Sequence, residues 1–438
     1  MSVDVTSLDR EWIRRFSEAR KEPSWMTELR MHAYELAAQL PLPKVEKMRL
    51  ERWPLSAVRP SETGSQDTGP AVDPSVLSTL KRDMPWLDDA AANLLVQEDG
   101  QTRFVRLEEG LKRQGVVLTS LETALKEHET LVRDHFMKGA IAVDENRLTA
   151  LHASLWSGGV FIYVPRNVEV EMPVQLLFRF LSQGHGCYPH VLIVADENSS
   201  LTVVENSGSD AVASGLHIAV TEVYVKRGAR VRFASVHLFQ ESVIDVTFRR
   251  ANVGQDGQME WILGELNDGH TLAENYSILR ENGGTSASRL ITIGTGKQQC
   301  NYQSRNRHIG QHTESEIFSR GVTRDASWII MDGVTKIDKG ARRADGRQEQ
   351  KVLMLSEQSR GDANPILYID ENDVQAGHAA GVGQVNPDQL YYLMSRGIPK
   401  EKAEQLIIMG FLEPVVTRIP VEGIRQQLLT VIERKLQA

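Results

Sequence analysis

Residues 191–204 read VLIVADENSSLTVV, two aliphatic and β-branched runs on either side of the turn signal Asn198-Ser199-Ser200. Residues 218–238, IAVTEVYVKRGARVRFASVHL, repeat this arrangement around Arg227-Gly228-Ala229. Similar runs occupy 243–248 and 329–334, and further turn signals lie at 255–257, 283–285 and 339–341. Short runs of this composition between turn signals predict β-strands. The first four turns recur about every 28 residues, an interval typical of the stacked coils of a β-solenoid.

Two arrangements of such strands fit this pattern. A solenoid explains the regular turn spacing, whereas an antiparallel β-sandwich produces a similar succession of strands and turns. The residue identities repeat poorly from one interval to the next, so the spacing alone leaves both open. In either case the strand-rich core is expected to span residues 158–384.

Helical periodicity precedes this core. Trp12, Ile13 and Phe16 recur at helical spacing, and so do apolar residues between 25 and 40, a run that Pro41 ends. Residues 1–157 are therefore expected to form a helical or mixed N-terminal region. A flexible linker is expected near 59–74, where Ser, Thr, Gly and Pro accumulate.

The pattern returns to helix in residues 385–438. Asn386 is a favourable N-cap, Pro387 suits the first helical position, and Gly397 ends this helix. Two more amphipathic helices follow. They would either cover the open end of a solenoid or form a docking surface for a partner, and the pattern favours neither.

Composition and charge argue against several classes of protein. With 58 acidic and 50 basic residues the net charge is -8, whereas a nucleic-acid-binding surface is normally basic. The first residues, Met1-Ser2-Val3-Asp4, do not resemble a signal peptide, and no apolar run approaches the roughly 18 residues of a membrane span. We therefore expect a cytoplasmic protein that binds neither nucleic acid nor membrane.

Standard catalytic motifs are incomplete. Residues 294–297, GTGK, resemble the end of a phosphate-binding loop, but Gln298 stands where a Ser or Thr must ligate magnesium. Cys187 and Cys300, the two cysteines of the chain, cannot build a Cys-rich metal site. We therefore expect a non-catalytic protein that does not hydrolyse ATP.

Histidines give two candidates for metal binding. The spacing of His308 and His312 would put both on one face of a strand, although no third ligand accompanies them. His378 lies in the densest constellation of the chain, residues 360–397, between small residues that let another backbone approach closely. A single imidazole can donate one ligand or one proton, but transition-metal sites usually take three or four protein ligands.

The C-terminal constellation resembles the signature of a known family. Residues 361–365 (GDANP), His378 in its Gly-His-Ala setting, and 395–398 (SRGI) followed by Ala403 are similar to the SufB/SufD family, scaffold proteins of SUF iron–sulfur cluster assembly. Glu51-Arg52-Trp53 lies in the helical N-terminal region, ahead of the strand-rich middle, in the same order as in the family. The resemblance implies a right-handed parallel β-helix, flanked by helical regions, in a complex with the partner scaffold SufB and the ATPase SufC.

Within the family the chain resembles the SufD branch. It has only two cysteines, Ala379 directly follows His378, and Ala376 stands where some relatives carry a cysteine. The resemblance then implies that His378 faces SufB and offers one ligand or proton-transfer group to a transient iron–sulfur cluster whose thiolates come from SufB. The surface of the C-terminal helices that would receive SufC includes Tyr391, Arg396, Gly397 and Leu406.

Three further expectations accompany this interpretation. The isolated chain should hold no stable cofactor, a flavin in the assembled complex is compatible with the resemblance, and a homodimer could form when SufB is missing. The competing interpretation is a β-helix carbohydrate-active enzyme that uses paired carboxylates such as Asp370 and Asp373. Such enzymes are commonly exported, and no export signal is recognisable here.

Overall fold

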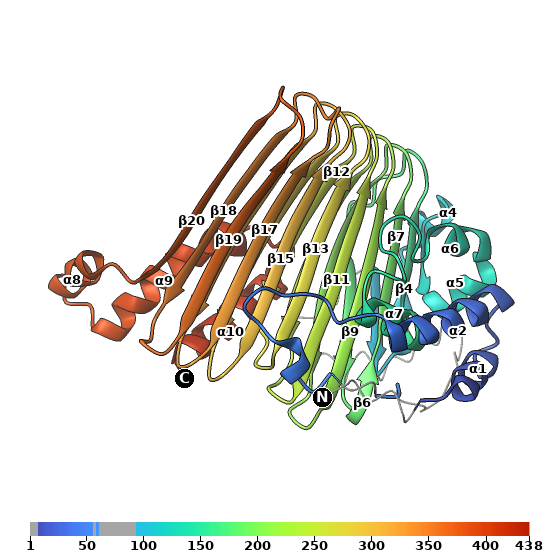
Figure 1. Ribbon diagram of the computed structural model, residues 1–438, viewed down its shortest axis with the longest axis horizontal. Coiled ribbons are helices and arrows are strands. Elements are labelled where there is room, and N and C mark those ends of the chain that lie inside the picture. The colour runs from blue at the N-terminus through green and yellow to red at the C-terminus, as the bar shows by residue number, and fades with distance from the viewer. Residues whose placement is uncertain (1–7, 56–57, 61–92, 438) are drawn as a thin grey trace.

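A computed structural model describes residues 8–55, 58–60 and 93–437, and its core is made of two long β-sheets (Figure 1). Sheet 1 contains, in spatial order, β2 (Gln101–Arg106), β1 (Asn93–Glu98), β5 (Val174–Phe180), β8 (Ser200–Ser209), β10 (Arg230–Leu238), β12 (Gln258–Glu265), β14 (Thr285–Gly294), β16 (Glu314–Thr323), β18 (Asp345–Met354) and β20 (Gln375–Gln384). Sheet 2 contains β3 (Val117–Ser120), β4 (Gly159–Val164), β7 (His190–Ala195), β9 (Ser214–Val225), β11 (Val243–Val253), β13 (Thr271–Leu279), β15 (Gln299–His308), β17 (Trp328–Ile337) and β19 (Arg360–Ile369), with β6 (Gln183–Cys187) beside β9.

The chain alternates between the sheets, so each coil contributes one strand to each of them. From β8 and β9 onward every strand pairs in parallel with the strand two places along the chain. This pairing confirms the parallel β-solenoid, and the antiparallel sandwich is wrong. Strands β1 and β3, which precede residue 158 in the N-terminal region, also belong to the sheets, because β1 pairs with β5 and β3 pairs with β4.

The turns stack as regularly as the strands. Asn198, Gly228, Asp256 and Gly283 all have positive φ, and each backbone N–H donates to a carbonyl of the next turn at 2.8–2.9 Å. A Cβ on Gly228 would approach Asn198 Oδ1 to 2.4 Å, and one on Gly283 would approach Asp256 Oδ1 to 2.1 Å. Glycine is therefore required where an Asx side chain of the preceding turn fills the space. The 28-residue turn period is the solenoid repeat.

Helices of the N-terminal region cover the outer face of sheet 2 (Figure 1). These are α1 (Arg10–Ala19), α2 (Ser24–Gln39), the 3₁₀ helix η1 (Leu50–Arg52), α5 (Leu121–Glu127), α6 (Glu129–His135) and α7 (Arg147–Leu155). In contrast, α4 (Glu109–Arg113) packs through Leu111 against the apolar core inside the solenoid. The segment around η1 continues along sheet 2 toward its far end, where Lys47 Nζ donates to Asp362 Oδ1 at 2.7 Å. The predicted linker at 59–74 lies almost entirely outside the described residues.

Three helices end the chain: α8 (Pro387–Ser395), α9 (Lys400–Val416) and α10 (Glu422–Gln437). Asn386 Oδ1 accepts from Asp388 N at 2.8 Å, and Gly397 has a φ of +84°, as the predicted caps require. Apolar residues of α9 and α10, among them Leu412 and Leu428, pack on the outer face of sheet 1. Of the two alternatives left open for the C-terminal helices, α9 and α10 therefore do not cover the open end, while α8 projects past the last coil (Figure 1). Within the described part of the chain, no helix combines the length and apolarity that crossing a bilayer requires.

Candidate functional site

The solenoid ends in two exposed strands, β19 and β20. Within the described residues, β19 pairs only with β17, and β20 pairs only with β18. Nearly all of β20 is solvent-exposed, and most of β19 is half-buried at best. This end of both sheets therefore presents unpaired backbone groups, the usual template for pairing with another chain.

His378 lies on this uncovered edge. It is in register with Gln348 of β18, whose buried side chain donates to Thr335 Oγ1 at 2.7 Å inside the coil. Because residues in register stack on one face of a parallel sheet, His378 faces the same interior side, where no described coil covers it. The imidazole also borders a cavity of about 490 Å³. A partner that continued the sheets would meet this histidine directly.

The neighbouring strand β19 carries the 361–365 segment. Asp362 accepts hydrogen bonds from Lys47 Nζ at 2.7 Å, Trp328 Nε1 at 2.7 Å and Arg360 Nε at 3.0 Å. These donors outweigh the effect of partial burial and lower the pKa of the Asp362 carboxyl. The motif is therefore held rigidly beside the edge, and the N-terminal segment reaches it through Lys47.

The thiols of the chain lie far inside the fold. Cys187 and Cys300 are buried, and desolvation raises the pKa of both, that of Cys300 to about 11. Both thiols are protonated near neutral pH and do not reach the surface. Any thiolate ligand at the open end must therefore come from another chain.

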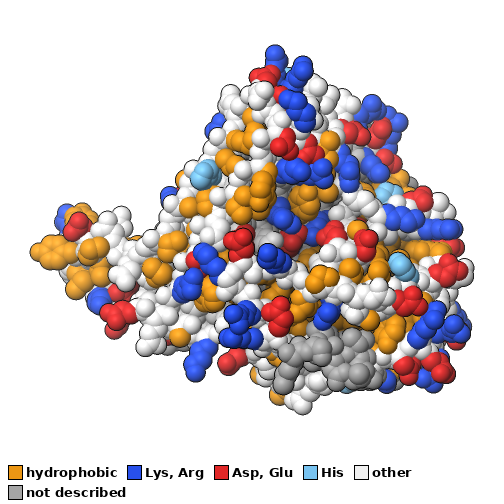
Figure 2. Space-filling model, viewed as in Figure 1, with side chains coloured by type: hydrophobic (Ala, Val, Ile, Leu, Met, Phe, Trp, Pro, Cys, Tyr) orange, Lys and Arg blue, Asp and Glu red, His pale blue; other side chains and the backbone are white. Residues whose placement is uncertain are grey.

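At the other end of β20, the chain enters α8 beside an apolar groove. The groove has a volume of about 820 Å³, and its lining includes Gly381, Gly383, Tyr392, Leu406, Ile407 and Phe411. Tyr391 is 75% exposed and Leu406 46% exposed. Hydrophobic side chains gather on the projecting α8 (Figure 2). Arg396 ends α8 and its Nη2 lies 3.3 Å from Tyr392 Oη; neither Tyr391 nor Arg396 lines the groove.

Comparison with known proteins decides the family. The model "SUF system FeS cluster assembly, SufBD core domain" matches residues 178–411, and "SufBD protein N-terminal region" matches residues 18–176. The chain is 42% identical to the iron–sulfur cluster assembly protein SufD of Bacillus subtilis over 98% of both chains. It belongs to the SufB/SufD family. It is 29% identical to SufB of the same organism over 95% of this chain and 90% of the relative, and 30% identical to a Staphylococcus haemolyticus SufBD family protein over 94% and 89%.

Within the family the chain is therefore most like SufD, as the sequence indicated, and it is a protein of SUF iron–sulfur cluster assembly. The carboxylates of the competing enzyme interpretation lie in the turn between β19 and β20. Asp373 is exposed and lies 3.8 Å from Arg343, while Glu371 between them is buried and accepts from Gly340 N at 2.9 Å. No observation favours carbohydrate cleavage by Asp370 and Asp373.

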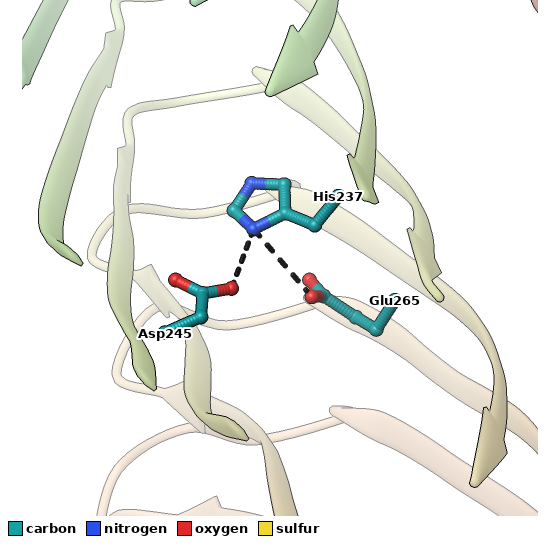
Figure 3. Close-up of side chains that lie close together, drawn as sticks. All are labelled: His237, Asp245 and Glu265. Atoms are coloured by element: carbon teal, nitrogen blue, oxygen red, sulfur yellow. Dashed lines mark hydrogen bonds and ion pairs between the residues drawn. The ribbon is translucent and has the colours of Figure 1, made fainter. Parts of the chain in front are cut away.

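A buried charged cluster inside this SufD-like solenoid was not predicted (Figure 3). His237 of β10, Asp245 of β11 and Glu265 of β12 bring one imidazole and two carboxylates together, with ligand atoms within 4.8 Å of one another. His237 Nδ1 lies 2.7 Å from Asp245 Oδ2 and 3.7 Å from Glu265 Oε2. On the other side of the ring, Nε2 lies 3.0 Å from Glu205 Oε1. All four side chains are at least 93% buried.

The members of this cluster shift the pKa values of one another. Burial alone would lower the pKa of His237, but the carboxylates of Glu265, Asp245 and Glu205 raise it to about 10. Burial likewise opposes ionisation of Asp245, yet His237 and His217 hold its pKa well below the usual range. The contacts of these side chains alone thus favour a protonated His237 beside an ionised Asp245 in the core of the coil.

A second buried chain of titratable groups joins α7 to sheet 2. His152 Nδ1 donates to Ile218 O at 2.9 Å, His152 Nε2 lies 3.1 Å from His190 Nδ1, and His190 Nε2 lies 3.1 Å from Glu222 Oε2. Because the carbonyl takes the Nδ1 proton, His152 Nε2 accepts from His190. Between His190 and Glu222 one proton must therefore be shared.

The register explains how the first cluster could have been found. His237 pairs with Glu265, and His217 pairs with Asp245, each 28 residues along the chain. Applying the turn period to charged residues inside strands would have brought these pairs together. His308 and His312 do not share a strand face. His308 is the last residue of β15 and forms hydrogen bonds with Thr313 and Ser315, whereas His312 lies in a turn with a φ of 56°.

Proposed function

We propose that this chain is a non-catalytic scaffold subunit of a SUF assembly complex. It pairs with a SufB-type partner through β19 and β20, and it offers His378 to a cluster that forms transiently at that interface. The observation that carries this proposal is the uncovered end of the solenoid, where His378 faces the interior side of the last coil.

The composition of the edge supports a close interface. Between Ala376 and Gly383, β20 consists mainly of glycine and alanine, so a second backbone could approach without displacing large side chains. Two β-solenoids of similar cross-section, joined end to end, would satisfy the unpaired N–H and C=O groups of both edges. The partner in this arrangement is a relative of the same fold.

The chemistry at the interface would be shared between the two chains. His378 supplies one nitrogen ligand or one proton, and the partner supplies thiolates, because Cys187 and Cys300 are buried and protonated. The cluster is cargo here, so the isolated chain holds none. This division explains why a scaffold of this type needs an exposed imidazole and no exposed cysteine.

The groove beside α8 is the second part of the proposal. Its apolar lining and the exposed Tyr391 and Leu406 are suited to receive the ATPase SufC. The nucleotide would be hydrolysed by that partner, since residues 294–297 form the turn between β14 and β15 and Gln298 is buried. A strand links the two proposed interfaces, with His378 near the start of β20 and the groove at its end.

Co-expression with SufB and SufC tests this function. We expect the wild-type chain to co-purify with both, and His378→Ala to lower the cluster formed per complex at least tenfold without changing the yield of complex. His185→Ala is the matched control, because His185 is an exposed strand histidine in β6, far from β20 (Figure 1).

Two outcomes would contradict the proposal. Cluster formation by the His378→Ala complex at the level of the His185→Ala control would remove the role of His378. Separately, Leu406→Asp should abolish co-purification of SufC while SufB is retained. Retention of both partners by that variant would show that the ATPase binds elsewhere.

A further inference from the structure

Two buried carboxylates converge on one ring nitrogen of His237. Two carboxylate oxygens, Asp245 Oδ2 and Glu265 Oε2, face Nδ1 at 2.7 and 3.7 Å. On the opposite side, Nε2 lies 3.0 Å from Glu205 Oε1, an acceptor, and 3.0 Å from Arg249 Nη2, a donor. If the proton is on Nε2, the Nδ1 lone pair points at oxygens of both carboxylates, an arrangement that is repulsive unless a cation lies between them.

Arg249 does not supply that cation. Its Nη1 donates to the other oxygen of Glu265, Oε1, at 2.8 Å, and its Nη2 lies 3.3 Å from Ser235 Oγ and 3.0 Å from His237 Nε2. The guanidinium is thus on the Nε2 side of the ring. Its acceptors are Glu265 Oε1, Ser235 Oγ and His237 Nε2, so it donates to neither of the two oxygens that face Nδ1.

A proton on Nδ1 satisfies only one of the two carboxylate oxygens that face this nitrogen. Such a proton would be donated to Asp245 Oδ2 at 2.7 Å, but Glu265 Oε2 is buried and, within the described residues, has no hydrogen-bond donor. Buried carboxylate oxygens are rarely left without one. Glu265 Oε2 is therefore aimed at Nδ1 and Asp245 without a partner of its own.

We propose that His237 Nδ1, Asp245 Oδ2 and Glu265 Oε2 bind one divalent transition-metal ion in the core of the solenoid. One imidazole and two carboxylates suit Zn²⁺, Fe²⁺ or Mn²⁺. The outer contacts fit a metal site as well. Glu205 accepts from the far nitrogen of His237, and His217 Nδ1 lies 2.8 Å from Asp245 Oδ1, the kind of carboxylate and histidine contacts that orient metal ligands.

The ligands come from three successive strands and both sheets, so the ion joins the two faces of neighbouring coils. Because all three side chains are buried, the ion enters while the chain folds and not afterwards. This site is separate from the open end and independent of His378. Its role is to hold the middle of the solenoid together.

Metal analysis of the purified full chain, and refolding with defined ions, test this site. After dialysis against a chelator, we expect about one tightly held ion per native chain by mass spectrometry of the elements. Chain unfolded in chelator and refolded with Zn²⁺ or Co²⁺ should unfold at a higher temperature than chain refolded without metal. Bound Co²⁺ should also show the visible absorption of a low-symmetry nitrogen and oxygen site.

Glu265→Gln should lose the ion and the metal-dependent shift. The control is Glu260→Gln, on the outer face of the same strand, where Glu260 pairs with Arg232 at 2.7 Å. Two results would overturn the proposal: a metal-free wild type whose unfolding temperature is the same with and without Zn²⁺, Co²⁺ or Mn²⁺, or Glu265→Gln that holds the ion as well as the control. The wild-type comparison decides the matter even if Glu265→Gln does not fold.

Discussion

Lys435 fixes the last turn of α10 to the solenoid. Its side chain is 3% exposed, and Nζ donates to Asn267 O at 2.8 Å and to Asp268 Oδ1 at 2.5 Å in the turn after β12. Arg434 precedes it on the same helix and faces the other oxygen of Asp268 at 3.7 Å, but its side chain is 58% exposed. The buried Lys435 and the solvent-exposed Arg434 therefore both face the carboxylate of Asp268.

Lys435 should stabilise the docked helix α10 more than Arg434 does. Lys435→Met keeps the aliphatic stem and removes two hydrogen bonds from a charged donor, worth about 1.5–3 kcal/mol each, while relieving the cost of burying the ammonium. The net loss should be about 2 kcal/mol, or about 30-fold in the opening equilibrium of the helix. An exposed pair contributes about 0–1 kcal/mol, so Arg434→Met should change that equilibrium less than about threefold.

Native-state hydrogen exchange measures this directly. In Lys435→Met the amides of α10 should exchange about 30 times faster, while those of α2 on the opposite sheet stay protected. Arg434→Met serves as the control. Equal exchange of α10 in the two variants, or unchanged protection in Lys435→Met, would refute the assignment of Lys435 as the anchor of the C-terminal helices.

Three other predictions concern protonation, thiols and assembly. Burial raises the pKa of Glu222 to about 8 and lowers that of His190 to about 3, so the folded pair retains a proton that the unfolded chain releases only between about pH 6.5, where the unfolded His190 loses its proton, and pH 8. Stability from this pair should fall as pH rises, by about 1–2 kcal/mol from pH 6 to 8 in urea unfolding; a flat or rising profile contradicts it. Cys187 and Cys300 should resist iodoacetamide at pH 7.5 until the chain unfolds, and mass spectrometry of the native protein checks this. Without SufB the open ends should pair into a homodimer that added SufB dissociates, as light scattering would detect.

The strand-rich core and its repeat could be predicted from the turns, whereas the choice of a parallel solenoid over a sandwich came from the family resemblance. Asn198, Gly228, Asp256 and Gly283 occupy positive-φ positions that few other residues tolerate, and their spacing is the coil length. The same is true of the Asn386 cap of α8. These signals are local, since each depends on a few neighbouring residues.

The surface against which α9 and α10 pack could not be predicted in this way, because it is formed by residues far away in the sequence. Their apolar stripes, which include Leu412 and Leu428, indicate burial but not against which surface, and the outer face of sheet 1 offers its own stripe through Ala234 and Ile262. The charged cluster was missed for a related reason. His237, Asp245 and Glu265 lie on three strands, and only the coil register brings them together.

The two interfaces proposed here are joined by an exposed edge strand. Strand β20 pairs with β18 alone among the described strands, is almost wholly exposed, and leads directly into α8 beside the groove. In contrast, α10 is fixed to the turn after β12 by Lys435 and packs on sheet 1. A partner that pulls on α8 therefore loads β20 first, while the rest of the C-terminal region stays in place. Because His378 lies on β20, movement of this strand would alter the proposed cluster interface without unfolding the solenoid.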